Sequence, residues 1–454
     1  MSRLANVLVA SADTARQGVL VDILAENQCS ALGCDTADEL MSLARSTHPD
    51  LILIDMADPS MDGLAVARNL RAEGRRPDSP MPAAPIMVIA SQRRADLYED
   101  ALAMGVEDVL VDPLDDAELM CRIWPLLRLS TIATEVEGRI RAATALGAAV
   151  PPDGDDGSDL PGSVLVLRDT AVTQESQVPL PYGGGFTFVS AVSNRDAERL
   201  LSKQAFDAVV LVAVDGDGAE RMLAFCELLR SKPNLYDLPV ILIAPKAAIT
   251  DRSDPYWRGV TRLVLAPAPH QEIEYGLSGL TARKRRRWSL RRALDRIRVP
   301  DLCDPVTKLY GEPFLRANLG ILVEDARTWH RRLSLIHLRM NAYDAIAGMH
   351  GRRAADLLAR QTAQWIQRSV RAEDLLARAG QDSFCICLPG IPLNEAALVR
   401  DRITGLLSRT AFALGSPGAA TAMRPSAGLA WFESGDTPDT LLRRARQGHG
   451  EEAA

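Results

Sequence analysis

Short apolar runs of strand length alternate with amphipathic stretches in the first part of the chain. The apolar runs are 6–10, 51–55, 86–90 and 109–111, and the amphipathic stretches include 14–26, 37–46 and 63–73. Because strands that alternate with helices form a parallel sheet covered on both faces, this pattern predicts an α/β domain with a doubly wound parallel sheet. The carboxyl ends of its strands would form the functional edge.

The same spacing of apolar runs returns after a linker. We expect a long helix over 115–149 and then a linker in the Pro-, Gly- and Asp-rich segment PPDGDDGSDLPG. Further apolar runs follow at 163–168, 208–213, 238–243 and 262–266. A repeat of this length indicates tandem duplication of one domain and not a solenoid. A basic segment, 283–298, carries nine Lys or Arg residues against one Asp and leads into a third unit.

Composition narrows the class of protein. Hydrophobic residues make up 47% of the chain and charged residues 24%, which is typical of globular domains. The net charge of −7 disfavours nucleic acid as a partner, although segment 283–298 could bind nucleic acid or anionic lipid instead of serving as a helical connector. The seven cysteines lack CxxC pairs, so we expect neither a zinc site nor disulfides. No segment reaches the ~18 apolar residues of a membrane span, and we expect a cytoplasmic protein.

The segment PDLILIDMADPSMDG resembles the phosphorylation loop of response-regulator receiver domains, with Asp55 at the phosphoacceptor position. The resemblance implies flavodoxin-like folds for both N-terminal units. A phosphoacceptor needs acidic neighbours for Mg²⁺, a hydroxyl and a Lys. Ser11 stands in place of the acidic pair, Ala90 in place of the hydroxyl residue and Asp112 in place of the Lys. We interpret Asp55 as a remnant in a docking scaffold, with a phosphorylation-driven response regulator as the alternative. Val212 at the second unit's acceptor position excludes phosphorylation there.

The third unit carries family landmarks in sequence order. DPVTKLYGEPF lies at 304–314 and SAGLA at 426–430; between them two strand-like runs, LLARA and FCICL, flank Gly-Gln-Asp-Ser as a hairpin. These segments resemble the GGDEF (diguanylate cyclase) family, which implies a nucleotidyl-cyclase-like α+β fold. The expected domains are a first receiver at 1–148, a linker at 149–162, a degenerate second receiver at 163–282, a connector at 283–300 and a degenerate GGDEF domain at 301–454.

The resemblance implies a damaged substrate site at the hairpin tip. Active members have G-G-[DE]-[DE]-F there, because glycine lets the backbone approach GTP and carboxylates hold Mg²⁺. Gln381 puts a side chain where the nucleotide should pass, Ser383 cannot replace a carboxylate, and Asp382 alone holds a dication poorly. His337 stands where the family's first core strand ends in a metal-binding Asp, and Arg339 follows. We expect no catalytic residue, cofactor or metal, with an active diguanylate cyclase as the alternative.

The sequence retains the residues of a second site of the family. Members are inhibited by cyclic di-GMP at an R-x-x-D motif in fixed register with the hairpin, where this chain has Arg371 and Asp374; Arg402 falls where members place a second binding Arg. The Arg fork matches guanine O6 and N7 or phosphate oxygens, and Asp accepts from the guanine N1–H. Because Arg353 and Asp356 show the same spacing, the register and not the tetrapeptide is specific. The alternative is an exposed ion pair that contributes little.

The order receiver–receiver–GGDEF is shared with PleD-type cyclases. Together with a damaged tip and a retained R-x-x-D motif, it resembles the PopA-like group of alphaproteobacterial cell-cycle response regulators. That resemblance implies a non-catalytic cyclic di-GMP adaptor at a cell pole, with partners in a ClpXP proteolysis pathway reached through an RcdA-like adaptor. The paired receiver domains suggest a homodimer. We expect the ligand to act by favouring one domain arrangement.

Overall fold

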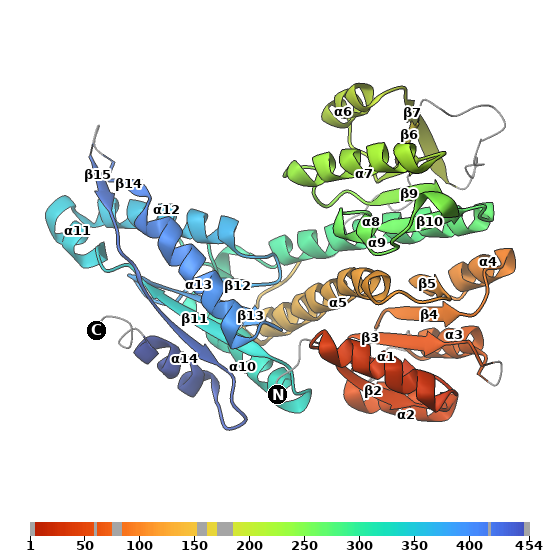
Figure 1. Cartoon of the computed structure of the whole chain (residues 1–454). Helices are drawn as coiled ribbons and strands as arrows, with labels where there is room; N and C mark the ends of the chain where they lie inside the picture. Colours follow the sequence, from red (N-terminus) through yellow and green to blue (C-terminus); the bar gives the residue numbers. More distant parts are fainter. Residues whose placement is uncertain are drawn as a thin grey trace. The chain divides into compact units, whose positions relative to one another are not determined.

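The computed structural model describes residues 5–58, 61–74, 84–151, 161–169, 185–415 and 419–448. These residues form two compact units (Figure 1). The N-terminal unit comprises Asn6–Ser130 and Asp155–Trp288, and the C-terminal unit comprises Met1–Ala5, Thr131–Gly154 and Ser289–Ala454.

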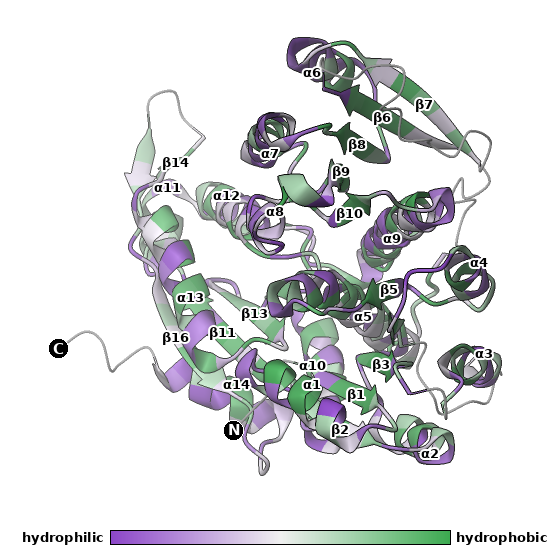
Figure 2. Cartoon of the chain, turned by 45° about the vertical axis from the view of Figure 1, so that its right-hand side comes forward, coloured by the Kyte–Doolittle hydropathy of each residue, from purple (hydrophilic) through white to green (hydrophobic). Residues whose placement is uncertain are grey.

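The first sheet of the N-terminal unit has five parallel strands in the order β2-β1-β3-β4-β5. The chain order is β1 (Asn6–Ala10), α1 (Thr14–Glu26), β2 (Ser30–Cys34), α2 (Ala37–Thr47), β3 (Leu51–Asp55), α3 (Gly63–Gly74), β4 (Ile86–Ala90), α4 (Ala95–Ala103), β5 (Asp108–Val111) and α5 (Asp116–Ala145). Strands β3 and β4 are buried throughout, as helices on both faces require, and Figure 2 shows β3 in the hydrophobic colour. The sequence pattern predicts four of these strands and misses β2, an edge strand whose Leu32 is 45% exposed.

A second parallel sheet repeats this order as β7-β6-β8-β9-β10. Its elements are β6 (Gly162–Arg168), β7 (Phe186–Ala191), α6 (Asn194–Lys203), β8 (Ala208–Val212), α7 (Gly216–Ser231), β9 (Val240–Pro245), α8 (Asp254–Trp257), β10 (Arg262–Ala266) and α9 (His270–Arg296). The expected duplication is thus confirmed, and strand order 2-1-3-4-5 is that of flavodoxin-like folds. The expected linker falls largely on 152–160, outside the described residues.

The two sheets of the N-terminal unit meet at a buried ionic cluster. Asp108, at the start of β5, is 1% exposed and contacts Arg122, Arg262 and Arg283. Arg262 is the first residue of β10, so β5 and β10 bring opposite charges together. Burial raises the pKa of Asp108, but the arginine charges outweigh burial and hold the pKa well below its usual range.

The C-terminal unit is built around an antiparallel sheet in the order β12-β13-β11-β16. Its elements are α10 (Glu312–Thr328), β11 (Leu333–Arg339), α11 (Tyr343–His350), α12 (Arg352–Ser369), β12 (Leu375–Arg378), β13 (Ser383–Pro389), α13 (Leu393–Ser408), β14 (Ala411–Ala413), β15 (Ala420–Ala422), β16 (Ser426–Trp431) and α14 (Pro438–Gln447). Alternate residues of β13 enter two cores: Cys385 and Cys387 pack on one face, Phe384 and Ile386 on the other. The α+β fold expected for this unit is therefore confirmed.

Candidate functional site

The hairpin tip between β12 and β13 is held by a buried arginine. Arg378 is 7% exposed and donates to the carbonyls of Gly380 and Gln381, at 3.1 and 2.7 Å, and to Asp304 Oδ1 at 3.0 Å. The sequence analysis treated Arg378 only as a strand residue. Its charge within an otherwise apolar run was the signal that it has buried partners.

The carboxylate at the tip is already neutralised. Arg339, the last residue of β11, lies with its Nε 2.6 Å from Asp382 Oδ2, and this hydrogen bond raises the pKa of Arg339. Strand β11 extends to Arg339, and Arg339, not His337, lies beside the tip. His337 is buried and pairs with Cys385 and Gly428 inside the sheet. Among the described residues, no cluster of three or more His, Cys, Asp or Glu side chains suits a metal ion.

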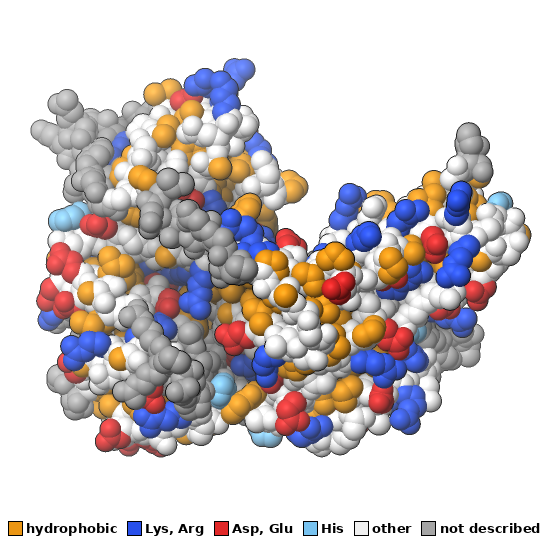
Figure 3. All heavy atoms as spheres, turned by 180° about the vertical axis from the view of Figure 1, so that it is seen from behind, with side chains coloured by type: hydrophobic (Ala, Val, Ile, Leu, Met, Phe, Trp, Pro, Cys, Tyr) orange, Lys and Arg blue, Asp and Glu red, His pale blue; other side chains and the backbone are white. Residues whose placement is uncertain are grey.

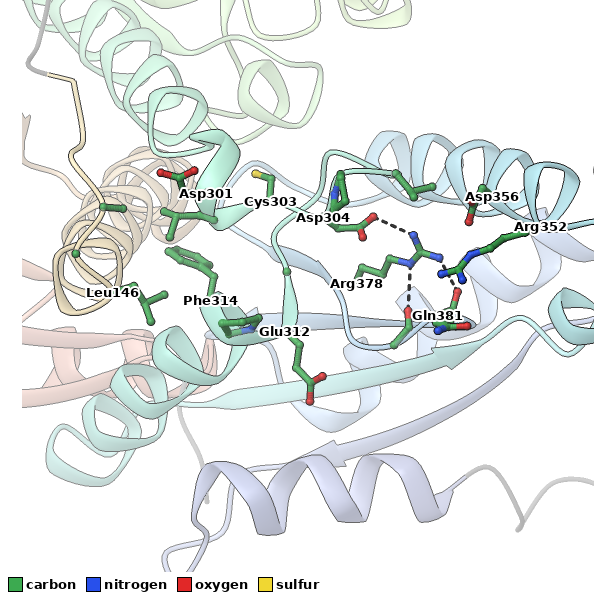
Figure 4. A pocket seen from close by; sticks show the side chains of 18 residues that line it. Leu146, Asp301, Cys303, Asp304, Glu312, Phe314, Arg352, Asp356, Arg378 and Gln381 are labelled. Atoms are coloured by element: carbon green, nitrogen blue, oxygen red, sulfur yellow. Dashed lines mark hydrogen bonds and ion pairs between the residues drawn. The ribbon is translucent and has the colours of Figure 1, made fainter. Parts of the chain in front are cut away.

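A pocket of about 720 Å³ lies beside the tip. This volume is within the ~300–1,000 Å³ of ordinary small-molecule sites. Figure 4 shows Arg352, Asp356 and Gln381 close to Arg378 in its wall. Asp356 accepts a hydrogen bond from the Tyr343 hydroxyl at 3.2 Å. The sequence analysis did not single out Arg352 and noted Asp356 only for its spacing to Arg353, because their proximity to the tip arises from the packing of α12.

The R-x-x-D motif forms one turn between α12 and β12. Asp374 Oδ2 accepts from the Arg371 backbone N–H at 2.7 Å, and the Arg371 side chain is exposed. Arg402, on α13, donates to the carbonyl of Ser369 at 2.6 Å. Arg371, Asp374 and Arg402 therefore gather around the end of α12, although Arg402 lies 33 residues from its hydrogen-bond acceptor.

Asp374 is unusual within this turn. It is 6% exposed, and its Oδ1 is buried without a hydrogen bond from any described residue. Burial raises the pKa of Asp374 to about 7. A buried acceptor that lacks a donor is expensive, and such atoms are frequent at ligand sites.

Asp55, at the end of β3, is buried against a cation of the same domain. Asp55 is 1% exposed; its Oδ2 accepts from the Ser11 hydroxyl at 2.8 Å and lies 2.8 Å from Arg16 Nε. The other end of the same guanidinium donates to Asp112 at 2.8 Å. Burial lowers the pKa of Arg16, but the Asp112 hydrogen bond and the Asp55 charge outweigh burial and raise it. Sequence reasoning missed Arg16, since it lies on α1 and its partners Asp55 and Asp112 are far away in the sequence.

The second parallel sheet shows a similar arrangement. Val212 at the end of β8 is fully buried, as its apolar side chain requires. Asp169, directly after β6, is 4% exposed and pairs with Arg221 of α7 at 2.8 Å. Each parallel sheet therefore has an arginine paired with a buried carboxylate at the carboxyl ends of its strands.

Two segments of the chain match known protein families. The family described as "Diguanylate cyclase, GGDEF domain" matches residues 301–451, and that described as "Response regulator receiver domain" matches residues 7–123. The chain carries a receiver domain and a GGDEF domain. The response regulator PleD of Caulobacter vibrioides is 27% identical over 415 residues, which are 90% of this chain and 88% of that protein. The architecture is therefore PleD-like.

Further similarities cover single domains. The two-component response regulator PhoP of Pseudomonas aeruginosa is 32% identical over 95 residues, 21% of this chain and 39% of that protein. The solved GGDEF domain of DgcB from Caulobacter crescentus, in complex with c-di-GMP, is 19% identical and covers 33% of this chain and 86% of that chain, with a TM-score of 0.32.

The basic segment before the GGDEF domain belongs to α9. Four of its cations pair with carboxylates of the N-terminal unit: Arg283 with Asp108, Lys284 and Arg285 with Asp207, and Arg287 with Asp237. Over the face seen in Figure 3, Lys and Arg side chains lie among Asp and Glu side chains. These contacts favour a structural role for the segment. Within the described part of the chain, no helix is both long and apolar enough to cross a bilayer.

Proposed function

We propose that this chain is a cyclic di-GMP receptor that no longer synthesises the dinucleotide, and that Arg371, Asp374 and Arg402 bind it. The observation that carries the proposal is the convergence of these three side chains around one turn at the end of α12. Two exposed guanidinium groups flank a carboxylate there.

The chemistry of the turn suits a guanine base. Asp374 Oδ1 needs a hydrogen-bond donor, and the guanine N1–H and amino group supply two. The guanidinium groups of Arg371 and Arg402 match guanine O6 and N7 or the phosphate oxygens, and can stack on the purine. A dinucleotide with two guanines and two phosphates offers all of these groups together.

Loss of synthesis follows from the hairpin tip. A cyclase needs carboxylates that hold Mg²⁺ and a backbone that GTP can approach. Here the Asp382 carboxylate is already paired with Arg339, and Ser383 carries no charge. The exposed Gln381 places a side chain where the backbone would have to approach GTP. Each missing charged contact costs a few kcal/mol in a transition state, and ~1.4 kcal/mol is tenfold in rate.

The experiment is titration calorimetry of the full chain with cyclic di-GMP. We expect saturable binding at micromolar or lower concentration, loss of binding in Arg371→Ala, and unchanged binding in Arg353→Ala. Arg353 is the matched control, because it is exposed and has the same spacing to an Asp. Absence of binding to the wild type, or equal loss in both variants, would overturn the proposal.

An active diguanylate cyclase is the second candidate. It is favoured by the family match and by the pocket beside the tip, where Arg352 and Asp356 lie close to Gln381. Incubation with GTP and Mg²⁺ or Mn²⁺ separates the two, since the receptor leaves GTP unchanged and the cyclase releases pyrophosphate. A response regulator driven by phosphorylation of Asp55 is the third reading, and acetyl phosphate labelling tests it.

The biological role rests on resemblance to PopA-like regulators. We propose on that ground an adaptor that acts at a cell pole as a homodimer and promotes regulated proteolysis in the cell cycle. Its partners would be an RcdA-like adaptor and the ClpXP protease. A reconstituted ClpXP reaction tests this, because substrate degradation should require both this chain and cyclic di-GMP.

A further inference from the structure

The second half of helix α5 is part of the C-terminal unit. Ile132, Val136 and Ala142 are buried in the same core as α10 and strands β12 and β13. The helix therefore packs on strand β12, which follows the R-x-x-D turn. This packing brings a residue far away in sequence, Arg139, to the turn.

Arg139 is buried where an arginine is costly. It is 1% exposed and donates from Nη2 to the carbonyl of Glu373 at 2.6 Å, across 234 residues of sequence. Its guanidinium lies 3.7 Å from Glu135 Oε2 and 5.9 Å from the centre of the Tyr310 ring. A buried guanidinium is stable only when such partners hold it, so its position is well defined.

The acceptor of this hydrogen bond belongs to the ligand-binding turn itself. Glu373 directly precedes Asp374, and the turn closes between Asp374 and Arg371 through contacts of 2.7 and 3.3 Å. Arg139 thus fixes the backbone from which Asp374 projects. A shift of that carbonyl would move Asp374 and Arg371 together, and binding constellations tolerate only about 0.5 Å of error.

We propose that Arg139 is a positioning residue for the cyclic di-GMP site and couples ligand binding to helix α5. This inference rests on the proposed function. Arg139 itself does not touch the ligand; it sets the turn that does. By linkage, ligand that binds the turn must in return stabilise the packing of α5 on the C-terminal unit.

The experiment compares three variants of the full chain with the wild type. Arg139→Met removes the hydrogen bond, and Arg139→Lys keeps a positively charged donor at the same position. Arg141→Met is the matched control, since Arg141 lies two residues beyond on α5 but is 56% exposed and paired with Asp325. Calorimetry gives the affinity, and hydrogen exchange with and without cyclic di-GMP reports on amides 131–145.

We expect Arg139→Met to weaken binding about tenfold or more, the usual loss for a charge-assisted hydrogen bond. Arg139→Lys should recover most of the affinity and Arg141→Met all of it. The ligand should protect amides 131–145 in the wild type but not in Arg139→Met, a change that a merely structural role would not produce. Wild-type affinity in Arg139→Met and Arg139→Lys, equal loss in Arg141→Met, or absence of protection overturns the inference. If the wild type binds no cyclic di-GMP, the proposed function itself is overturned, and not only the role of Arg139.

Discussion

Replacement of Arg16 by Met tests whether the buried Asp55 carboxylate depends on an internal cation. Asp55 would keep the Ser11 hydroxyl and the Ala57 backbone N–H as donors, at 2.8 and 3.2 Å, but would lose its positive partner. Breaking a fully buried ion pair costs about 3–5 kcal/mol. Because the Arg16 side chain is 26% exposed, water can enter, and we expect a loss of about 2–3 kcal/mol.

Native-state hydrogen exchange is the suitable assay, since unfolding of a chain with two units is not a two-state process. The exchange free energy of amides in β1 and β3 should fall in Arg16→Met. In Arg45→Met it should change by less than about 1 kcal/mol, because Arg45 forms an exposed ion pair with Glu73.

A double-mutant cycle with Asp55→Asn isolates the pair. Asn at position 55 carries no charge, so loss of Arg16 should cost about 1–2 kcal/mol less in that background. The same ion pair predicts that acetyl phosphate with Mg²⁺ does not label Asp55, because the Arg16 guanidinium already lies against its carboxylate. A coupling energy below about 0.5 kcal/mol, or stoichiometric labelling of the wild type, would refute the reasoning.

Three further predictions concern other charged groups. Asp108→Asn leaves buried arginines without their shared counter-ion and should destabilise the N-terminal unit by about 3–5 kcal/mol, seen as lost exchange protection in β5 and β10; a loss below about 1 kcal/mol contradicts this. Burial raises the pKa values of Asp374 and Glu135 to about 7, so the folded C-terminal unit binds more protons than the unfolded chain between about pH 4 and 7. Its stability should therefore fall as pH rises through that range and level off above it, with a shallower fall in Asp374→Asn; a rise, or an unchanged slope, contradicts this. Arg378→Ala frees three acceptors around the tip and should cost about 2–4 kcal/mol in exchange protection of β12 and β13, whereas Arg353→Ala at an exposed position should not.

Much of the fold could be predicted because burial leaves a local trace in sequence. Strands covered on both faces are continuous apolar runs, so β1, β3 and β4 stand out, and the duplicated spacing indicates the second sheet. Edge strands such as β2 and β7 are partly exposed, which weakens the pattern, and the sequence analysis missed both.

For the candidate sites too, features that are local in sequence could be predicted, and contacts between distant residues could not. The sequence by itself determined the chemistry of the hairpin tip and the register of Arg371 and Asp374, because a hairpin joins neighbours in sequence. Only the tertiary structure decided which partners the buried arginines meet: Arg16 pairs with Asp112 across 96 residues, and Arg139 donates to the backbone carbonyl of Glu373 across 234. A polar contact between distant residues gives no periodic pattern in the sequence, since it forms only when the topology brings distant strands and helices together.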